Sequence, residues 1–446
     1  MCVPVLTFDN FKKPTGFKTI TVYNNKGGVG KTTLCCNLAD KLSSKGYRVL
    51  LIDADVQLNS TLIFFDRLKA RSDKTVDFET YWTDMDMPYA EMVKGDKHIQ
   101  GERITFYNQF ELVMNEGFSE RNQLRDPIKI MPNLDLIPGD MRMFYINDEL
   151  QNYIEKANKE QMRKMRTMLT AYGQDGYDFV LIDMSPASDF LNQTLWFSSD
   201  YIIMPATYDR YSKIALPNLS KWIERIWLQK HKFWIDNPDP KPKEGRRPKV
   251  IAVTCTGFKK YGGEISLSHQ VDSESMGTKL KEFCGAMRKH NMLASALFND
   301  IKPWYDSHIL NALSNAKAKI GDNIMESLSA DLSALAGIPI LEIRDYSKMM
   351  LVFQNCYKPV YALSSKDLKT VRATLDLTYK LHREEANLMF ELLAYLVVRM
   401  SDLDGTFEYR SAADEEEYWR DRVPVPTPKT SQPKKEKARK TKKQKL

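Results

Sequence analysis

A glycine-rich segment that joins a short apolar run to a helical pattern constrains the fold of this chain more than any other feature. The run over residues 19–23, Thr-Ile-Thr-Val-Tyr, suits a buried strand, and glycines follow at Gly27, Gly28 and Gly30. Glycine lets the backbone bend so that successive N–H groups converge on phosphate oxygens, and the next helix adds its positive dipole end. The sequence therefore predicts a strand, a phosphate-binding loop and a helix, in that order.

The residues around these glycines supply the charges that such a loop needs. Lys31 would reach the β- and γ-phosphates, and the hydroxyl of Thr32 would hold Mg²⁺. The ordinary motif, G-x-x-x-x-G-K-[ST], requires a glycine at position 25, where this chain has Asn25 followed by a second lysine, Lys26. The simpler alternative, a glycine turn with two solvated lysines, does not explain the flanking strand and helix.

The segment over residues 26–32, Lys-Gly-Gly-Val-Gly-Lys-Thr, resembles the deviant Walker A motif of the ParA/MinD family of ATPases. In that family the early lysine crosses a dimer interface to the phosphates that the partner subunit binds. The resemblance implies a homodimer around ATP and Mg²⁺, with Lys26 and Lys31 as catalytic residues. It also implies nucleotide contacts along the whole loop, from Lys26, Gly27, Gly28, Val29, Gly30, Lys31, Thr32 and Thr33.

A second apolar run, over residues 49–52, follows Arg48 and leads into two aspartates, Asp53 and Asp55. The segment over residues 53–59, Asp-Ala-Asp-Val-Gln-Leu-Asn, resembles the family motif D-x-D-P-Q-x-N, whose second aspartate orients the attacking water. By that match Asp55 is the candidate water-positioning residue, and Asp53 acts on Mg²⁺ indirectly. Helix capping is the competing role for Asp53. Val56 replaces the family's proline, which affects the expected rate of hydrolysis more than the existence of the site.

A third apolar run, over residues 179–182, ends in Asp183 and has the Walker B pattern, in which a strand places a carboxylate near Mg²⁺. The family often continues D-x-P-P, whereas this chain has Asp-Met-Ser-Pro at 183–186, so one proline is missing. The expected metal set is Thr32, Asp53 and Asp183.

The strand, helix and strand of residues 19–53 form one βαβ unit. This unit predicts an α/β fold, a mostly parallel P-loop sheet with helices on both faces. Within the second insertion we expect the Gly/Ser-rich stretch 257–278 to be a loop, followed by accessory helices. The expected organisation is an N-terminal extension (1–17), an ATPase domain (18–400) with insertions at about 95–128 and 257–335, an acidic and Pro-rich linker (401–428), and a disordered basic tail (429–446).

The net charge of +7 resides in the tail, which carries nine Lys/Arg and one acid, while the rest of the chain is close to neutral. Such a tail can neutralise phosphates without reading sequence, and a merely solubilising role is equally compatible with it. No apolar run is long enough to span a membrane, and the N-terminus lacks a secretion signal. The six cysteines have no C-x-x-C spacing. We therefore expect a cytoplasmic protein with reduced thiols and no integral membrane association.

These features favour a ParA-type partition ATPase that binds DNA non-specifically in its ATP state and is stimulated by a ParB-like partner. It would then be associated with the nucleoid, and Arg344 and Lys348 are candidate DNA contacts by resemblance. One alternative is a MinD-like positioning ATPase at the membrane, which would need a terminal amphipathic helix. Another is a slow, nucleotide-locked scaffold in a plasmid-maintenance or defence system. An iron–sulfur ATPase would need cluster cysteines at the dimer axis, which the scattered cysteines do not supply.

Overall fold

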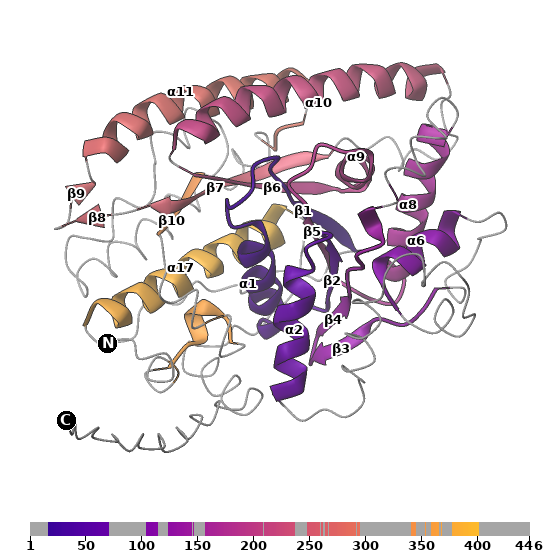
Figure 1. Ribbon diagram of the computed structural model, residues 1–446, viewed down its shortest axis with the longest axis horizontal. Helices are drawn as coiled ribbons and strands as arrows, with labels where there is room; N and C mark the ends of the chain where they lie inside the picture. The colour runs from indigo at the N-terminus through magenta and orange to yellow at the C-terminus, as the bar shows by residue number, and fades with distance from the viewer. Residues whose placement is uncertain are drawn as a thin grey trace, which may run out of the picture.

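The protein is described by a computed structural model (Figure 1). The described residues are 17–70, 104–114, 124–144, 146, 157–207, 209–236, 248–258, 260–261, 264–265, 267–290, 292–294, 340–344, 353, 358–364, 367 and 377–400. The expectations for the linker and the basic tail, for residues 1–16 of the N-terminal extension, and for residues 295–339 therefore fall outside the described residues.

The architecture is built on an eight-stranded sheet with the strand order β10-β7-β6-β1-β5-β2-β4-β3. Every neighbouring pair is parallel except β3 and β4, which form an antiparallel hairpin at one edge. This sheet confirms the predicted α/β class. Its strands are β1 (Lys18–Val22), β2 (Val49–Ala54), β3 (Ile128–Met131), β4 (Leu134–Ile137), β5 (Phe179–Met184), β6 (Tyr201–Thr207), β7 (Lys249–Phe258) and β10 (Ile340–Arg344).

Helices cover both faces of the sheet because side chains alternate along each buried strand. On β2, Val49 and Leu51 pack into one hydrophobic cluster, whereas Leu50 and Ile52 pack into the other. The first cluster includes α1 (Lys31–Ser44), α2 (Asn59–Ala70) and α17 (Leu377–Met400). The second includes α6 (Phe106–Met114), α8 (Ala157–Gly173), α9 (Phe190–Ser198), α10 (Arg210–Asp236) and α11 (Leu267–Lys289). The predicted three-layer arrangement is therefore present.

Helix α1 follows the phosphate-binding loop directly and ends at Ser44, two residues before Gly46. Gly46 has φ 91°, a left-handed conformation that glycine adopts at low cost, and the N–H of Tyr47 donates back to the carbonyl of Leu42. The chain then turns straight into β2. This short return fixes the ends of β1 and β2 near each other, with β5 between them in the sheet.

One segment differs from the sequence-based expectation. The Gly/Ser-rich stretch 257–278 is not one loop, because β7 extends to Phe258, a two-stranded ribbon follows (β8, Lys260–Tyr261, and β9, Glu264–Ile265), and α11 begins at Leu267. Helix α11 runs beside α10 along one side of the molecule (Figure 1). The insertion expected at about 95–128 contains α6, whose Phe106 and Phe110 are buried against the sheet. For α6, burial against neighbouring elements outweighs the polar composition of the stretch.

Candidate phosphate-binding site

The phosphate-binding loop has the backbone geometry that its glycines predict. Gly28 and Gly30 have φ 72° and 86°, in the left-handed region where a side chain would be strained. Gly30 is also the N-cap of α1, and its carbonyl accepts from the N–H of Leu34 at 2.9 Å. The first turn of α1 therefore faces the loop with its free N–H groups, which is the arrangement that binds anions.

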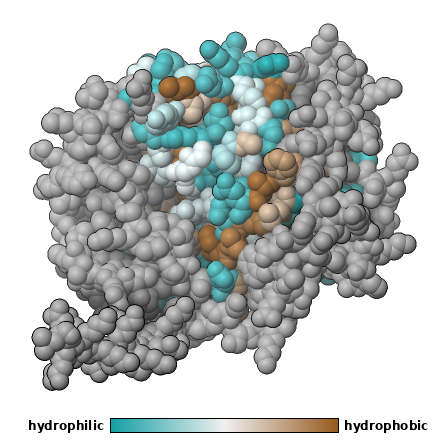
Figure 2. Space-filling model, viewed as in Figure 1, coloured by the Kyte–Doolittle hydropathy of each residue, from teal (hydrophilic) through white to brown (hydrophobic). Residues whose placement is uncertain are grey.

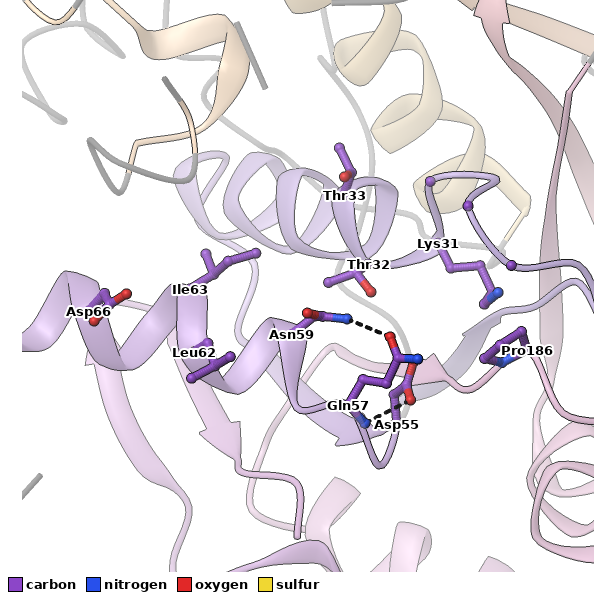
Figure 3. A pocket seen from close by; sticks show the side chains of 13 residues that line it. Lys31, Thr32, Thr33, Asp55, Gln57, Asn59, Leu62, Ile63, Asp66 and Pro186 are labelled. Atoms are coloured by element: carbon purple, nitrogen blue, oxygen red, sulfur yellow. Dashed lines mark hydrogen bonds between the residues drawn. The ribbon is translucent and has the colours of Figure 1, made fainter. Parts of the chain in front are cut away.

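The side chain of Lys31 lies inside the loop. Its Nζ donates to the carbonyl of Lys26 at 3.0 Å, and only 7% of the residue is exposed. Burial lowers the pKa of Lys31 to about 8, against the negative charges of Asp183 and Asp55, which raise it. Figure 3 shows the Lys31 side chain directed toward Asp55 and Pro186. This position lets Lys31 meet a phosphate held by the loop.

Lys26 lies in a different place, against the start of α10. Its Nζ donates to Thr207 Oγ1 at 2.7 Å and to Ser212 Oγ at 3.2 Å, and it forms an ion pair with Asp209. The Lys26 side chain is 19% exposed. To reach a phosphate on another subunit, as the family resemblance implies, Lys26 would have to leave these three partners.

The two strand-end carboxylates, Asp53 on β2 and Asp183 on β5, face each other in the parallel register of the sheet. Asp53 is fully hydrogen-bonded. Its Oδ2 accepts from the N–H and the hydroxyl of Thr61 at 2.8 and 2.6 Å, and its Oδ1 accepts from the N–H of Asp55 at 3.1 Å. Burial raises the pKa of Asp53, and these hydrogen bonds oppose that rise.

Asp183 is buried, but neither of its oxygens makes a well-formed hydrogen bond with a described residue. Burial, together with the charges of Asp53 and Asp55, raises the pKa of Asp183, and the nearby hydroxyls of Thr32 and Ser60 act against this rise. Buried carboxylates without partners are costly, and they are commonly explained by an ion that binds there.

The donor set fits Mg²⁺ in the way that a nucleotide site requires. The described residues contain no group of three or more His, Cys, Asp or Glu side chains arranged to hold a metal without further ligands. A hard cation next to Asp183 and the Thr32 hydroxyl would therefore complete its oxygen shell with phosphate and water, as Mg²⁺ usually does. Asp53 accepts hydrogen bonds from Thr61 and from the backbone N–H of Asp55, so it would act on the metal indirectly and not as a ligand.

Asp55 lies at the mouth of the same site, in a tight turn between β2 and α2. Its Oδ1 accepts from the N–H of Gln57 at 3.0 Å, and its carbonyl accepts from the N–H of Leu58, which has φ 56°. The side chain of Asn59 donates to Gln57 Oε1 at 3.3 Å. Val56 takes part in this turn without proline, and the turn still presents Asp55 to the cavity (Figure 3).

The glycine loop, Lys31 and Asp55 line one cavity of about 520 Å³, a size suited to a small-molecule ligand. It is bounded by the glycine loop, the first turn of α1, the turn from Asp55 to Asn59, one side of α2 and Pro186 (Figure 3). On the face of the molecule that includes α1 and α2, hydrophilic and hydrophobic residues lie side by side (Figure 2).

The structure thus brings together the predicted loop, Asp55 and the two strand-end aspartates, and it places Lys26 beside α10. Arg344 is the last residue of β10, where only its backbone is described, and Lys348 lies outside the described residues. The DNA contacts expected of these two residues therefore stay predictions.

Several residues that shape the site carry no signal in the local sequence. Thr61 links Asp53 to the N–H of Gly139, which donates to the Thr61 hydroxyl at 2.8 Å. Thr256, near the carboxyl end of β7, donates to the carbonyl of Val29 at 2.7 Å. Only the topology of the sheet, which places the ends of its parallel strands at one edge, could have indicated these contacts.

Known proteins with similar sequences point to the same kind of site. Residues 17–234 match the family model of an AAA domain. The chain is 28% identical over 211 residues to the chromosome partitioning protein ParA of Caulobacter vibrioides, which is 47% of this chain and 63% of that protein. It is 28% identical over 217 residues to the sporulation initiation inhibitor protein Soj of Bacillus subtilis, which is 48% of this chain and 67% of that protein. The match thus spans less than two thirds of the ParA protein's length.

A solved plasmid partition protein from Borrelia burgdorferi, bound to AMPPNP, is 24% identical, with a TM-score of 0.39 and coverage of 59% of this chain and 81% of that one. None of the described helices is both long and apolar enough to cross a membrane.

The glycine loop, the buried Lys31 and the aspartates at the ends of β2 and β5 define a P-loop nucleotide-binding domain. The matched region identifies it more closely. Residues 17–234 are similar to the ParA-type P-loop ATPases, and this similarity agrees with the geometry of the loop and the strand-end aspartates.

Proposed function

We propose that this chain binds ATP with Mg²⁺ and hydrolyses it slowly. The observation that carries the proposal is a left-handed glycine loop that lines one cavity together with Lys31 and Asp55, near the buried carboxylate of Asp183, whose oxygens make no well-formed hydrogen bond with a described residue. A structural aspartate in that position would be expected to have internal partners, as Asp53 does. A metal nucleotide would satisfy both the loop N–H groups and Asp183.

The chain's own residues account for the chemistry mainly by positioning and by charge. Lys31 and the N–H groups of the first turn of α1 oppose the negative charge on the phosphates. Asp55, anchored by the N–H of Gln57, orients the attacking water. Mg²⁺, when bound near Thr32 and Asp183, supplies electrostatic stabilisation to the phosphate oxygens.

In a homodimer that forms around two nucleotides, Lys26 would contact the phosphates bound by the partner subunit. In a single subunit Lys26 is held by Asp209, Thr207 and Ser212, three groups at the β6–α10 junction. Phosphate charge on a facing subunit competes for the same ammonium group. ATP binding would therefore shift Lys26 from its own subunit to the partner and complete both sites.

We further propose a role in DNA partitioning, with non-specific DNA binding in the ATP state and activation by a ParB-like protein. The support comes from the names of the matched relatives, ParA among them, and from the basic tail. Arg344, Lys348 and the tail are the candidate DNA contacts. On this proposal the protein is cytoplasmic and associates with the nucleoid.

A second candidate function is the positioning of a cell-surface structure. The chain is 25% identical over 251 residues to the flagellum site-determining protein YlxH of Helicobacter pylori, covering 66% of that protein. On this alternative the ATP-bound dimer binds a membrane surface or a protein scaffold instead of DNA, with the same nucleotide site.

ATP turnover and DNA binding, measured on the full-length chain, test the proposal. Phosphate release should require Mg²⁺, and both Lys31→Ala and Asp55→Ala should abolish it. Asp55→Ala should retain nucleotide binding, because Asp55 acts on the water. Turnover that persists in Asp55→Ala would refute its assigned role.

The DNA arm uses non-specific duplex DNA with ATP, ADP or no nucleotide. Binding that needs ATP and Lys31, and that survives truncation after Pro428, would support partitioning. If binding is indifferent to nucleotide and lost on truncation, the basic tail alone accounts for the DNA affinity. The positioning alternative would then be favoured.

A further inference from the structure

We infer that Thr256 is a positioning residue for the nucleotide site, because its hydroxyl sets the orientation of the peptide between Val29 and Gly30. Thr256 Oγ1 lies 2.7 Å from the carbonyl oxygen of Val29 and 3.2 Å from that of Ala206. A hydroxyl has a single proton to donate. The shorter distance assigns it to Val29, 227 positions away along the chain.

The geometry of a trans peptide turns this contact into control of a phosphate-binding group. In a trans peptide the carbonyl of Val29 and the N–H of Gly30 point in opposite directions. With the Val29 carbonyl held toward β7, the N–H of Gly30 points away from β7. Gly30 lines the cavity, and its φ of 86° leaves this peptide plane without the steric restraint that a side chain would impose.

Thr256 can do this because it stands near the carboxyl end of its strand, two residues before Phe258. In the register of β6 and β7, Thr256 lies opposite Thr207. Thr207 in turn accepts from Lys26, so paired threonines on neighbouring strands hold the two halves of the loop. The methyl group of Thr256 also lies beside Gly30, because a Cβ built on Gly30 would be in van der Waals contact with it at 3.6 Å.

The inference rests on the proposed nucleotide binding and concerns how the loop is prepared for it. Without the Thr256 hydroxyl the Val29 carbonyl loses its donor, and the peptide plane can rotate so that a carbonyl, not an N–H, faces the phosphates. Loss of about one hydrogen bond to a charged group corresponds to an affinity lower by roughly tenfold or more.

The test measures MgADP binding to the full-length chain by isothermal titration calorimetry. Thr256→Val removes the hydroxyl and keeps the shape, whereas Thr256→Ser keeps the hydroxyl. Thr254→Val is the matched control, because Thr254 lies on the same strand, is buried, and has a hydroxyl without a hydrogen-bond partner among the described residues. Thermal unfolding of each variant separates binding from stability. If Thr256→Val does not fold, Thr256→Ala takes its place.

The expected result is a Kd at least about tenfold higher for Thr256→Val, values within about threefold of wild type for Thr256→Ser and Thr254→Val, and similar unfolding temperatures for all three. Equal affinity of Thr256→Val and wild type would overturn the inference, as would equal weakening by Thr256→Ser. A wild-type chain that binds no MgADP would instead refute the proposed function itself, and this inference with it.

Discussion

The facing carboxylates Asp53 and Asp183 should respond in opposite ways to the same conservative substitution. Asp183→Asn should stabilise the protein in the absence of nucleotide and Mg²⁺, because it removes a buried charge that has no well-formed hydrogen bond. Asp53→Asn should destabilise it. Both oxygens of Asp53 accept from backbone N–H groups, so either orientation of an amide would set an NH₂ group against an N–H donor.

The magnitude follows from the burial and the pKa shift. Burial raises the pKa of Asp183 in the folded state, so the folded chain keeps its proton to a higher pH than the unfolded chain does. Wild-type stability should therefore fall as the pH rises above the unfolded pKa of about 4. Asp183→Asn and wild type should be nearly equal at pH 4 and should diverge by about 1–3 kcal/mol at pH 8. Asp53→Asn should cost about 1–3 kcal/mol at neutral pH.

Urea unfolding followed by circular dichroism, at several pH values in EDTA, measures these differences. The same series with MgADP adds a second readout, since nucleotide should stabilise wild type and have little effect on Asp183→Asn. The reasoning is refuted if Asp183→Asn is destabilised as much as Asp53→Asn at every pH. That result would mean that Asp183 is stabilised by hydrogen bonds within the protein and needs no metal nucleotide to stabilise its charge.

Three further predictions concern the loop and its surroundings. Burial lowers the pKa of Lys31 to about 8, so the affinity for MgADP should fall as the pH rises from 7 to 9, and calorimetry that finds no such fall would contradict the role of its charge. Asp209→Asn should release Lys26 and tighten the ATP-dependent dimer by up to about fivefold in sedimentation experiments. The effect is small because the side chain of Asp209 is 39% exposed, and such an ion pair is worth about 1 kcal/mol or less. An unchanged or weaker dimer would contradict the idea that Asp209 and the phosphates of a second subunit compete for Lys26. Gly139→Ala should cost about 1–3 kcal/mol, because its Cβ would lie 2.6 Å from a leucine methyl group, whereas Gly285→Ala has open space in α11 and should be neutral or stabilising in the same unfolding assay.

The sheet and the loop could be predicted because their signals are local. Each parallel strand is a short apolar run, and the glycines at 28 and 30 are the residues that tolerate the left-handed backbone that the loop adopts. Asp53 and Asp183 each end such a run, and parallel strands bring their carboxyl ends to one edge of the sheet. For these parts, pattern and topology were sufficient.

The remaining features depend on contacts between distant parts of the chain. Lys26 is bound by residues more than 180 positions away, and no property of its own segment indicates the start of α10. The same holds for Thr256 and the Val29 carbonyl. The first part of α11, over residues 267–278, was missed because its Gly/Ser content is typical of a loop, whereas residues 279–289 belong to the stretch in which accessory helices were expected. Local propensity is a weak predictor where tertiary packing decides.

Sedimentation velocity of the full-length chain with MgATP, MgADP and no nucleotide tests the central claim most directly, with Lys31→Ala and Asp55→Ala measured alongside. A P-loop ATPase that dimerises around its nucleotide should be monomeric alone and with ADP. It should become dimeric with ATP, and Asp55→Ala should give the most persistent dimer because nucleotide is retained and not hydrolysed. Lys31→Ala should stay monomeric throughout. An oligomeric state that ignores both the nucleotide and Lys31 would contradict the proposal that this site binds ATP and couples it to a second subunit.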